Sequence, residues 1–448
     1  MTRVLIPSGA LGLGWEEAAL ERGLAEGPDI IAIDGGSTAS GPSYLGRGVS
    51  KYSRASTKAE WGALLDARHR AGCPLVIGTA GTCGTGSAVD WLAGITRECL
   101  AERGLNARVA LLRCDQDPAA LAARHREGGL HPLPGAPEVT PEGIAGATHA
   151  VALAGAEQIA AALRTGADIV IAGRATDTAI IAALPLMRGE HAGAAWHGAK
   201  IGECGALCAT NPQSGVLQID FDSGGFTATP HGTGARCTPR TVAAHMLYEN
   251  ADPDILHEPG GHLDVTRARY EPVGERSVRV TGSEWVPAPD YRVKLEAAGV
   301  AGFQTLLIAT VREPRYVTAV GEWCADIERR HAAKVRGRMG AVDYALDLRR
   351  IGIDATLGPL EPGGATPAEV GILAVVTAPT QEVATDVARL LNPYLLHHPL
   401  TAEEEQPTFS FPFSPAETER GPLHRFLLHH TMTLADPMDA FRLETFDA

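Results

Sequence analysis

The chain has 448 residues, of which 45% are hydrophobic and 21% are charged, and its 39 basic and 53 acidic residues give a formal net charge of −14. This length allows roughly two or three domains with a large buried core, and the negative charge argues against nucleic acid as a partner. No run approaches the roughly 18 apolar residues of a membrane span. The short apolar run before Pro7 is no signal peptide, so we expect a cytoplasmic protein that does not bind membranes.

The first 200 residues repeat one pattern, in which an apolar run ends in a cluster of Gly, Ser, Thr, Asp or Arg. These runs predict strands at residues 29–34, 75–78, 109–113 and 167–172. Alanine-rich segments before and between them predict helices at 15–25, 56–70, 88–103, 118–127 and 155–164. Strands that are apolar on both faces and alternate with helices belong to parallel sheets covered on both sides. We therefore predict an α/β fold with a mostly parallel, doubly wound sheet.

The pattern changes after residue 211. Short β-like runs at 215–221, 261–265 and 277–281 surround one predicted helix at 238–249. Beyond a Pro-Ala-Pro boundary at 287–289, the order is strand (303–311), helix (317–335), strand (371–376) and helix (381–396), and the proline-studded tail at 409–430 adds a strand or clasp. We therefore expect a main domain at 1–290 and a smaller α+β domain at 291–448.

The predicted strand ends supply the first candidate ligand-binding residues, because ligands of such sheets bind beyond the carboxyl ends of the strands. After the strand at 29–34 come Asp34, Gly36, Ser37 and Thr38, and after the strand at 75–78 come Thr79 and Cys83. Neither glycine-rich loop carries the lysine of a phosphate-binding loop. Each loop alone is equally consistent with a tight turn, but several in one sheet favour a binding site.

The loop at 173–178 gives the sharpest local signal, because it joins a buried strand to a helix whose N-terminus favours an anion. Gly173 allows close approach of the backbone, and Arg174 offers a planar fork for a carboxylate or phosphate. Asp177 either faces the ligand as a proton-transfer group or caps the helix. The competing interpretation is a capped helix with an arginine paired at the surface.

The segment at 197–208 brings together Lys200, Glu203 and Cys204. If the segment is helical, the three side chains fall on neighbouring turns of one face. A base, an acid and a thiol in a cleft suit proton transfer next to a carbonyl or hydroxyl. The alternative is a surface ion pair between Lys200 and Glu203, with Cys204 buried. Because glycines at 202 and 205 weaken a helix, we expect the segment to line the cleft.

The remaining cysteines and histidines give weaker signals. The eight cysteines contain no C-x-x-C pair, so a disulfide scaffold is excluded. Sixteen histidines include two adjacent pairs, but none has the spacing of a metal site, and we predict no metal. Cys83 lies near a helix N-terminus, where a thiol pKa can fall, yet without a histidine partner it is expected to be a structural or ligand-lining thiol.

Several longer stretches resemble the acyclic terpene utilisation (AtuA) family. They are STASGPSYLG (37–46), IAGRATD (171–177), GAKIGECGA (198–206), CTPRTVAAH (237–245), LYENADP (247–253) and FPFSP (411–415). The resemblance spans almost the whole chain and implies an α/β main domain with a small companion domain. It also implies a place in the catabolism of branched terpenoids as acyl-CoA esters. Cys83, and Thr176 where an aromatic residue is common, depart from the family pattern and suggest a different substrate.

The residues favour an enzyme, a lyase or hydro-lyase acting on a hydroxylated carboxylate or its CoA thioester. In this hypothesis Arg174 holds the acid group, Glu203 or Asp177 moves the proton, and Lys200 stabilises the developing oxyanion. The alternative is a non-catalytic acyl-CoA or small-acid binding subunit of a complex. A third hypothesis, a nucleotide-dependent ligase or kinase, is less well supported because the lysine of a phosphate-binding loop is missing. No separate cofactor is predicted beyond CoA as part of the substrate, and we expect a homo-oligomer.

Overall fold

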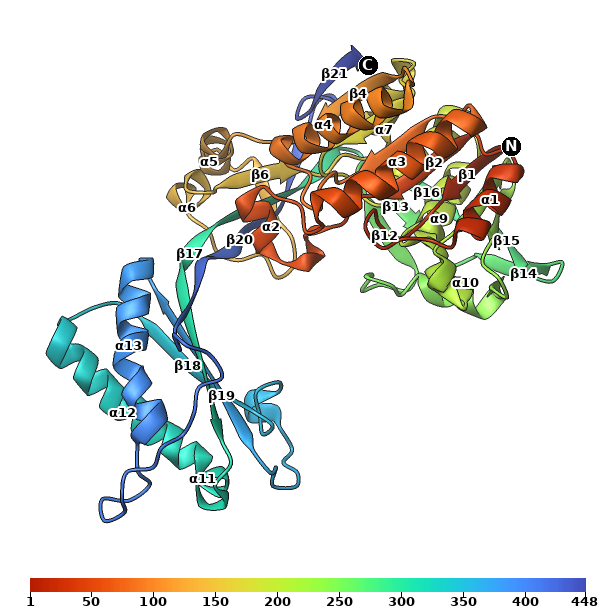
Figure 1. Cartoon of the computed structure of the whole chain (residues 1–448). Helices are drawn as coiled ribbons and strands as arrows, with labels where there is room; N and C mark the ends of the chain where they lie inside the picture. Colours follow the sequence, from red (N-terminus) through yellow and green to blue (C-terminus); the bar gives the residue numbers. More distant parts are fainter. The chain divides into compact units, whose positions relative to one another are not determined.

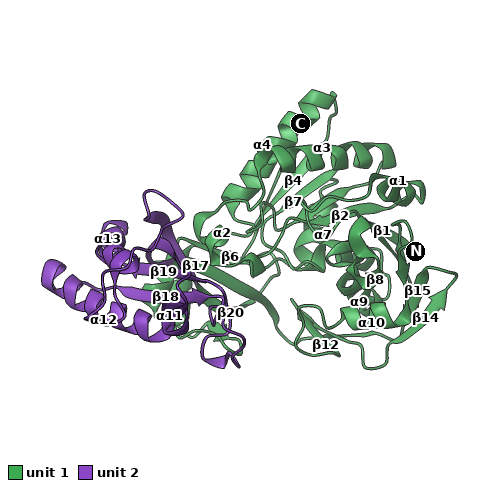
Figure 2. Cartoon of the chain, turned by 60° about the horizontal axis from the view of Figure 1, so that its bottom comes forward, with its two compact units in different colours: residues 1–299, 426–448 green, residues 300–425 purple.

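The computed structural model describes residues 1–448, which divide into two compact units (Figure 1; Figure 2). Unit 1 comprises residues 1–299 and 426–448, and unit 2 comprises residues 300–425. This division differs from the expected boundary at 290. Strand β17 (Tyr291–Val311) begins directly after the Pro-Ala-Pro segment and runs unbroken from unit 1 into unit 2, and the end of the chain returns to unit 1.

Five parallel strands form the centre of the ten-stranded sheet of unit 1, in the order β1-β2-β3-β7-β4. They are β1 (Thr2–Ile6), β2 (Ile30–Asp34), β3 (Leu75–Gly78), β4 (Arg108–Arg113) and β7 (Ile169–Ala172). Every residue of β2, β3 and β7 is buried, as expected for strands covered on both faces. The four strands predicted in this region are therefore present and parallel.

Antiparallel strands extend this sheet at both edges, so the sheet as a whole is mixed and the prediction of a mostly parallel sheet holds only for its centre. Beyond β1 lie β9 (Leu217–Asp222), β10 (Gly225–Pro230), β15 (Ser277–Thr281) and β14 (Arg269–Val273). Beyond β4 lies β21 (Arg442–Asp447), close to the C-terminus. Two of the β-like runs predicted after residue 211, at 215–221 and 277–281, thus join the same sheet, because β9 pairs directly with β1 and β15 pairs with β10. The third run, at 261–265, forms β13 (Gly261–Asp264) of a separate small sheet.

Helices cover both faces of the sheet. On one face, α1 (Glu17–Ala25), α3 (Arg54–Ala71) and α4 (Gly86–Arg103) pack Leu20, Trp61 and Val89 against the strands. On the other face, α7 (Ala156–Arg164), α8 (Ala179–Met187) and α9 (Ala192–Gly202) contribute Ile159, Ile180 and Trp196. The shorter helices of unit 1 are α2 (Pro42–Arg47), α5 (Pro118–Arg126), α6 (Pro141–Ala145) and α10 (Pro239–His245).

Smaller pieces of sheet complete unit 1. They are a three-stranded sheet of β12 (Ile255–Glu258), β13 (Gly261–Asp264) and β16 (Glu284–Pro287), the short pair β8 (Ala209–Thr210) and β11 (Arg236–Cys237), and β5 (Leu130–Pro132) and β6 (His149–Ala152). β6 pairs with the first half of β17, and β5 pairs with the end of β20 (Thr418–Leu434).

Unit 2 combines an antiparallel sheet with helices. The second half of β17 pairs with β19 (Val370–Ala378), which also pairs with β18 (Ala345–Ile351), all antiparallel. Alternate residues of β19 are buried because α12 (Val320–Met339) and α13 (Gln381–His397) cover one face of this sheet with side chains such as Trp323 and Leu391. The short α11 (Pro314–Thr318) precedes α12. Among the helices of the whole chain, none has both the length and the apolar character needed to cross a bilayer.

Candidate functional site

A cavity of about 510 Å³, here called the carboxylate cavity, lies at the carboxyl ends of the central strands of unit 1. Its walls include the segments after β1, β2 and β7, together with two stretches further along the chain, and its lining residues include Ser8, Gly9, Ala10, Asp34, Gly36, Ser37, Ser40, Lys51, Asp177, Cys204, Gln213, Tyr248 and Glu249. Ligands of open α/β sheets bind at this position. The structure thus brings five of the predicted site residues together in one cavity: Asp34, Gly36, Ser37, Asp177 and Cys204.

The strand-end loops are tied to one another through their backbones. The amide of Gly35 donates to the carbonyl of Gly78 (2.8 Å), and the amide of Thr79 donates to the carbonyl of Gly173 (2.9 Å). A Cβ atom on Gly35 would lie 2.5 Å from the carbonyl oxygen of Thr79, so only glycine permits this approach. The loops therefore form one continuous wall at the end of the sheet.

Asp34 and Asp177 are two carboxyl groups that line the cavity, Asp34 buried and Asp177 with a side chain that is 19% exposed. Asp34 accepts hydrogen bonds from the amides of Gly35 (2.8 Å) and Gly36 (3.0 Å). Burial and the neighbouring Asp177 nevertheless raise the pKa of Asp34 well above its usual value. Burial also raises the pKa of Asp177, against the opposing effect of Arg174. Two interacting carboxyl groups in a site of this kind hold a proton between them more readily than either would alone.

Arg174 does not line the cavity, because its guanidinium is engaged within the protein. Its Nε atom donates to Glu296 Oε2 (3.0 Å), and its Nη1 atom donates to Thr79 Oγ1 (3.2 Å) and lies 3.8 Å from Asp177 Oδ1. Thr38 Oγ1 also donates to Glu296 Oε2 (2.9 Å). Arg174, Thr38 and Thr79, predicted as substrate ligands, therefore form a network behind the cavity wall, where Arg174 holds Asp177 in place.

Glu296, on β17, is the centre of this network. Its Oε1 atom pairs with Lys294 Nζ (3.1 Å), and its Oε2 atom binds Arg174 and Thr38. Although burial opposes ionisation, Arg174 and Lys294 hold the pKa of Glu296 at about 2. Nothing in the sequence around Glu296 indicated this role, because its partners come from distant segments of the chain.

Lys200 and Glu203 form a buried ion pair beneath the cavity. Their side chains are 2% and 9% exposed, which excludes the surface-pair interpretation. Lys200 Nζ also donates to the carbonyl oxygen of Tyr248 (2.5 Å), a residue of the cavity wall. Burial raises the pKa of Glu203 to about 8, with Lys200 opposing the shift. Neither side chain lines the cavity, so the pair supports the wall from behind.

Cys204 follows the end of α9 and does line the cavity. The helix ends at Gly202, and Cys204 adopts a left-handed backbone conformation (φ 58°), so the expected single helical face for Lys200, Glu203 and Cys204 is not formed. The thiol lies 3.5 Å from the hydroxyl of Tyr248. Burial raises the pKa of Cys204 to about 12, which leaves it a neutral thiol near pH 7.

Two further predicted residues lie outside the cavity lining. Cys83 is fully buried, with its sulfur 3.5 Å from Thr85 Oγ1 and 3.9 Å from the carbonyl oxygen of Val49. Burial raises its thiol pKa despite the nearby start of α4. Gly173 is packed against the backbone of Gly84 and the side chain of Cys114, which leaves no room for a Cβ atom. Both residues support the loops rather than the cavity surface.

Lys51, Tyr248 and Glu249 are among the lining residues that the sequence did not single out. Lys51 is the one cationic side chain among the residues that line the cavity, and its Nζ atom lies 3.4 Å from Ser40 Oγ. Tyr248 and Glu249 lie in the stretch LYENADP (247–253), one of those that carry the family resemblance, and this resemblance was the one signal in the sequence that pointed to them. Glu249 is left-handed (φ 50°), as are Thr79 and Thr82 in the neighbouring loop. Such strained residues gather at functional sites.

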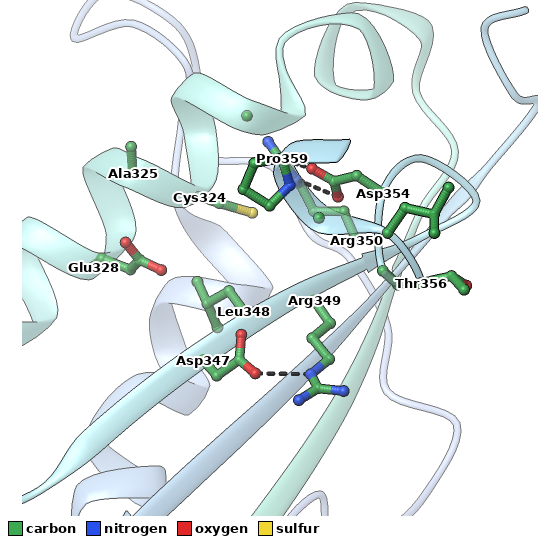
Figure 3. A pocket seen from close by; sticks show the side chains of 14 residues that line it. Cys324, Ala325, Glu328, Asp347, Leu348, Arg349, Arg350, Asp354, Thr356 and Pro359 are labelled. Atoms are coloured by element: carbon green, nitrogen blue, oxygen red, sulfur yellow. Dashed lines mark hydrogen bonds and ion pairs between the residues drawn. The ribbon is translucent and has the colours of Figure 1, made fainter. Parts of the chain in front are cut away.

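Unit 2 has its own cavity, of about 650 Å³, beside α12 and β18 (Figure 3). Figure 3 shows Arg349 paired with Asp347 and Arg350 paired with Asp354, so each arginine of this cavity has an acidic partner beside it. No group of three or more His, Cys, Asp or Glu side chains in either unit has the arrangement of a metal site. The carboxylate cavity of unit 1 is therefore the better candidate for chemistry.

Comparison with known proteins gives one match. The family model described as acyclic terpene utilisation family protein AtuA matches residues 62–411 of the chain. The match covers the loops after β3 and β7, the α9 segment, and most of unit 2. Comparisons with curated proteins and with solved structures return no significant match.

Proposed function

Since this chain belongs to the acyclic terpene utilisation (AtuA) family, we propose that it is an enzyme, a lyase or hydratase that removes water from, or adds it to, a small hydroxylated carboxylate or its CoA thioester. The observation that carries this proposal is the pair of carboxyl groups, Asp34 and Asp177, that line one cavity at the strand ends and whose pKa values are both raised. A pair in which one member is protonated and the other ionised contains both an acid and a base.

In the dehydration direction, the ionised member of the pair removes the proton from the carbon next to the carboxylate or thioester carbonyl. The protonated member gives its proton to the hydroxyl group on the adjacent carbon. The C–H and C–O bonds break, a C=C bond forms and water leaves, so atoms and charges balance. Hydration is the reverse. The hydroxyl of Ser37, which also lines the cavity, is available to orient the substrate hydroxyl.

Lys51 takes the role of anion anchor that the sequence assigned to Arg174. It is the cation that lines the cavity, whereas Arg174 is already held by Glu296. Lys200 is likewise occupied by Glu203 and the Tyr248 carbonyl. We therefore assign Arg174, Lys200 and Glu203 as positioning residues that fix Asp177 and the wall at Tyr248, and we keep Asp34 and Asp177 as the proton-transfer groups.

Incubation of the full chain in heavy water with a panel of hydroxy acids and hydroxyacyl-CoA esters tests this function. Mass spectrometry should detect loss of water and deuterium at the carbon next to the carbonyl. Asp34→Asn and Asp177→Asn should each lower turnover by roughly 10²–10⁴-fold, the usual contribution of a general acid or base. Asp66→Asn, at a half-exposed carboxylate of α3, is the matched control and should keep full activity.

The competing function is a non-catalytic acyl-CoA or small-acid binding subunit of a larger complex. Binding of a panel compound without exchange or loss of water, and with unchanged affinity in Asp177→Asn, would favour it over the enzyme. A homo-oligomeric state and a cytoplasmic location belong to the same proposal. Light scattering of the purified chain and fractionation of the producing cells test these two points.

A further inference from the structure

Unit 1 contains a second cavity of about 650 Å³, here called the apolar cavity, that shares no lining residue with the carboxylate cavity. Its walls are predominantly apolar and are built by Leu133, Pro134, Leu153, Pro259, Ala288 and Pro289. The volume lies within the range of about 300–1,000 Å³ that is usual for small-molecule sites. Such a cavity stabilises the apolar part of a ligand by removing it from water.

The more exposed part of the apolar cavity lining, here called its rim, holds two basic side chains and one acidic side chain. Arg292 and Lys294 line it, with Asp290 as the opposing acid and His257 on the neighbouring hairpin. The Arg292 side chain is 48% exposed and lies 3.3 Å from Asp290, so it remains open to a ligand. Lys294 is one-third exposed, while its Nζ atom is anchored at 3.1 Å by Glu296. An anionic group at this rim would meet two basic side chains.

The inner wall sets the orientation of the ligand. Glu258 and Thr176 line the cavity, and Glu258 Oε1 accepts a hydrogen bond from the hydroxyl of Thr178. Glu258 Oε2 is buried without a hydrogen-bond partner. A ligand carboxylate placed beside Glu258 would bring two carboxyl groups into one site, which disfavours the ionised form of both. The anionic head of a ligand therefore belongs at the rim and its apolar body inside.

We propose that the apolar cavity binds an amphipathic carboxylate, whose acid group pairs with Arg292 and Lys294 and whose hydrocarbon body lies between Leu153 and Pro259. The site is separate from the carboxylate cavity and does not depend on its chemistry. Failure of the proposed dehydration would leave this inference intact, and failure of binding here would leave the dehydration intact.

Isothermal titration calorimetry of the full chain with butyrate, hexanoate and octanoate tests the apolar body. Each methylene that enters the cavity should raise the affinity by about fourfold, so octanoate should bind roughly 200 times more tightly than butyrate. Octanol and octylammonium test the head group, and both should bind more weakly than octanoate because neither pairs with the basic rim.

Two variants locate the site. Arg292→Gln should weaken octanoate binding by at least about threefold, as for a partly exposed charge pair, while Lys51→Gln, the cation of the other cavity, should leave it unchanged.

Ala288→Trp should abolish binding by filling the entrance. Ala288 is exposed and its amide, which donates to the carbonyl of Gly260 (2.9 Å), is kept, so folding is preserved. Val273→Trp, at an exposed position outside both cavities, is the control for the added indole.

Affinity that is independent of chain length, tighter binding of octylammonium, or full binding by Ala288→Trp would each overturn the proposal. A loss of binding in Lys51→Gln equal to that in Arg292→Gln would also overturn it, because it would place the acid in the carboxylate cavity. Circular dichroism of each variant separates loss of binding from loss of fold.

Discussion

The ion pair of Lys200 and Glu203 illustrates how a single residue can support the cavity without touching a ligand. Both side chains are buried, and Lys200 also holds the carbonyl of Tyr248. Removing Lys200 leaves Glu203 without its cationic partner in the interior, where the carboxyl group must either carry an unpaired charge or take up a proton. Lys200→Met should therefore lower the free energy of unfolding by about 3–5 kcal/mol. Urea unfolding followed by tryptophan fluorescence measures this loss.

The double variant Lys200→Met with Glu203→Gln is the control for the Lys200 prediction. Because it leaves no buried charge, it should recover most of the stability lost in the single variant. A double variant as unstable as Lys200→Met alone would show that packing, and not the unpaired Glu203, causes the loss.

Glu258 should make the stability of the folded chain depend on pH. Burial raises its pKa to about 7, from the usual value of 4.5, although Thr178 opposes the shift. Between these pH values the folded chain keeps a proton that the unfolded chain has lost, so this group lowers stability as the pH rises from about 4.5 to 7. Glu258→Gln keeps the bond to Thr178 and should be more stable than the parent chain by about 2 kcal/mol at pH 8.

Thermal unfolding at pH 5 and pH 8 checks the prediction for Glu258. The advantage of Glu258→Gln should appear at pH 8 and largely vanish at pH 5. Glu271→Gln, on the exposed hairpin strand β14, should show no such change. An equal advantage at both pH values would mean that Glu258 does not hold the extra proton.

At the residue scale, the sequence predicted the polar residues that directly follow buried strands, but it missed residues whose partners lie on distant segments of the chain. Asp34, Ser37 and Asp177 were found because polar residues directly after buried strands meet at one edge of the sheet. Glu296 was missed because it lies within a long strand and gains its role only by contact with Arg174. The role of Arg174 itself was misread for the same reason, since its partner is 122 positions away.

The turn after α9 is the element that shapes the carboxylate cavity. Gly205 is left-handed (φ 67°), and a Cβ atom there would lie 2.5 Å from the carbonyl oxygen of Gly215 and 2.8 Å from the amide of Gly9. Gly205→Ala should therefore lower the free energy of unfolding by roughly 1–3 kcal/mol beyond the backbone cost alone, because the backbone atoms must move.

Gly189→Ala is the matched control for Gly205→Ala. Gly189 has a similar left-handed conformation (φ 77°), but a Cβ atom there would meet nothing within 4 Å. Its cost should be limited to about 1–2 kcal/mol for the left-handed backbone. Differential scanning calorimetry of the two variants checks the difference, and equal losses would contradict the crowding at Gly205.

At the element scale, the long apolar runs predicted the strands correctly, but the sequence did not predict which strands pair with one another. The continuous apolar runs predicted the parallel strands, because only a strand covered on both faces has that composition. The runs at 215–221 and 277–281 predicted strands but not their sheet, since β9 pairs with β1, about 215 positions earlier at the start of the chain. The helix predicted at 238–249 ends at His245, before the left-handed Glu249.

On the scale of the whole molecule, the returning C-terminal strand closes an edge of the main sheet. β21 pairs with β4 along its full length, the Cζ atom of Arg97 lies 3.9 Å from the centroid of the Phe446 ring, and Ala448 exchanges two backbone hydrogen bonds with Ala107. Deletion of residues 442–448 should expose β4 as an unprotected edge, lower the Tm by at least about 4 °C and promote aggregation. Phe446→Ala, which keeps the strand, should retain most of the stability, and a deletion variant with unchanged Tm would contradict this role.

The wall of the carboxylate cavity at Cys204 is fixed by backbone alone. The backbones of Cys204 and Gly9 pair in an isolated antiparallel β-bridge, and Gly205 is packed against Gly9 and Gly215. The left-handed backbone at Cys204 leaves this residue few other conformations. A wall so constrained has little conformational entropy left to lose when a ligand arrives. Rigid ligands that match its shape should thus gain most in affinity from this preorganisation. Flexible ligands should bind more weakly, because their own rotatable bonds lose conformational entropy on binding.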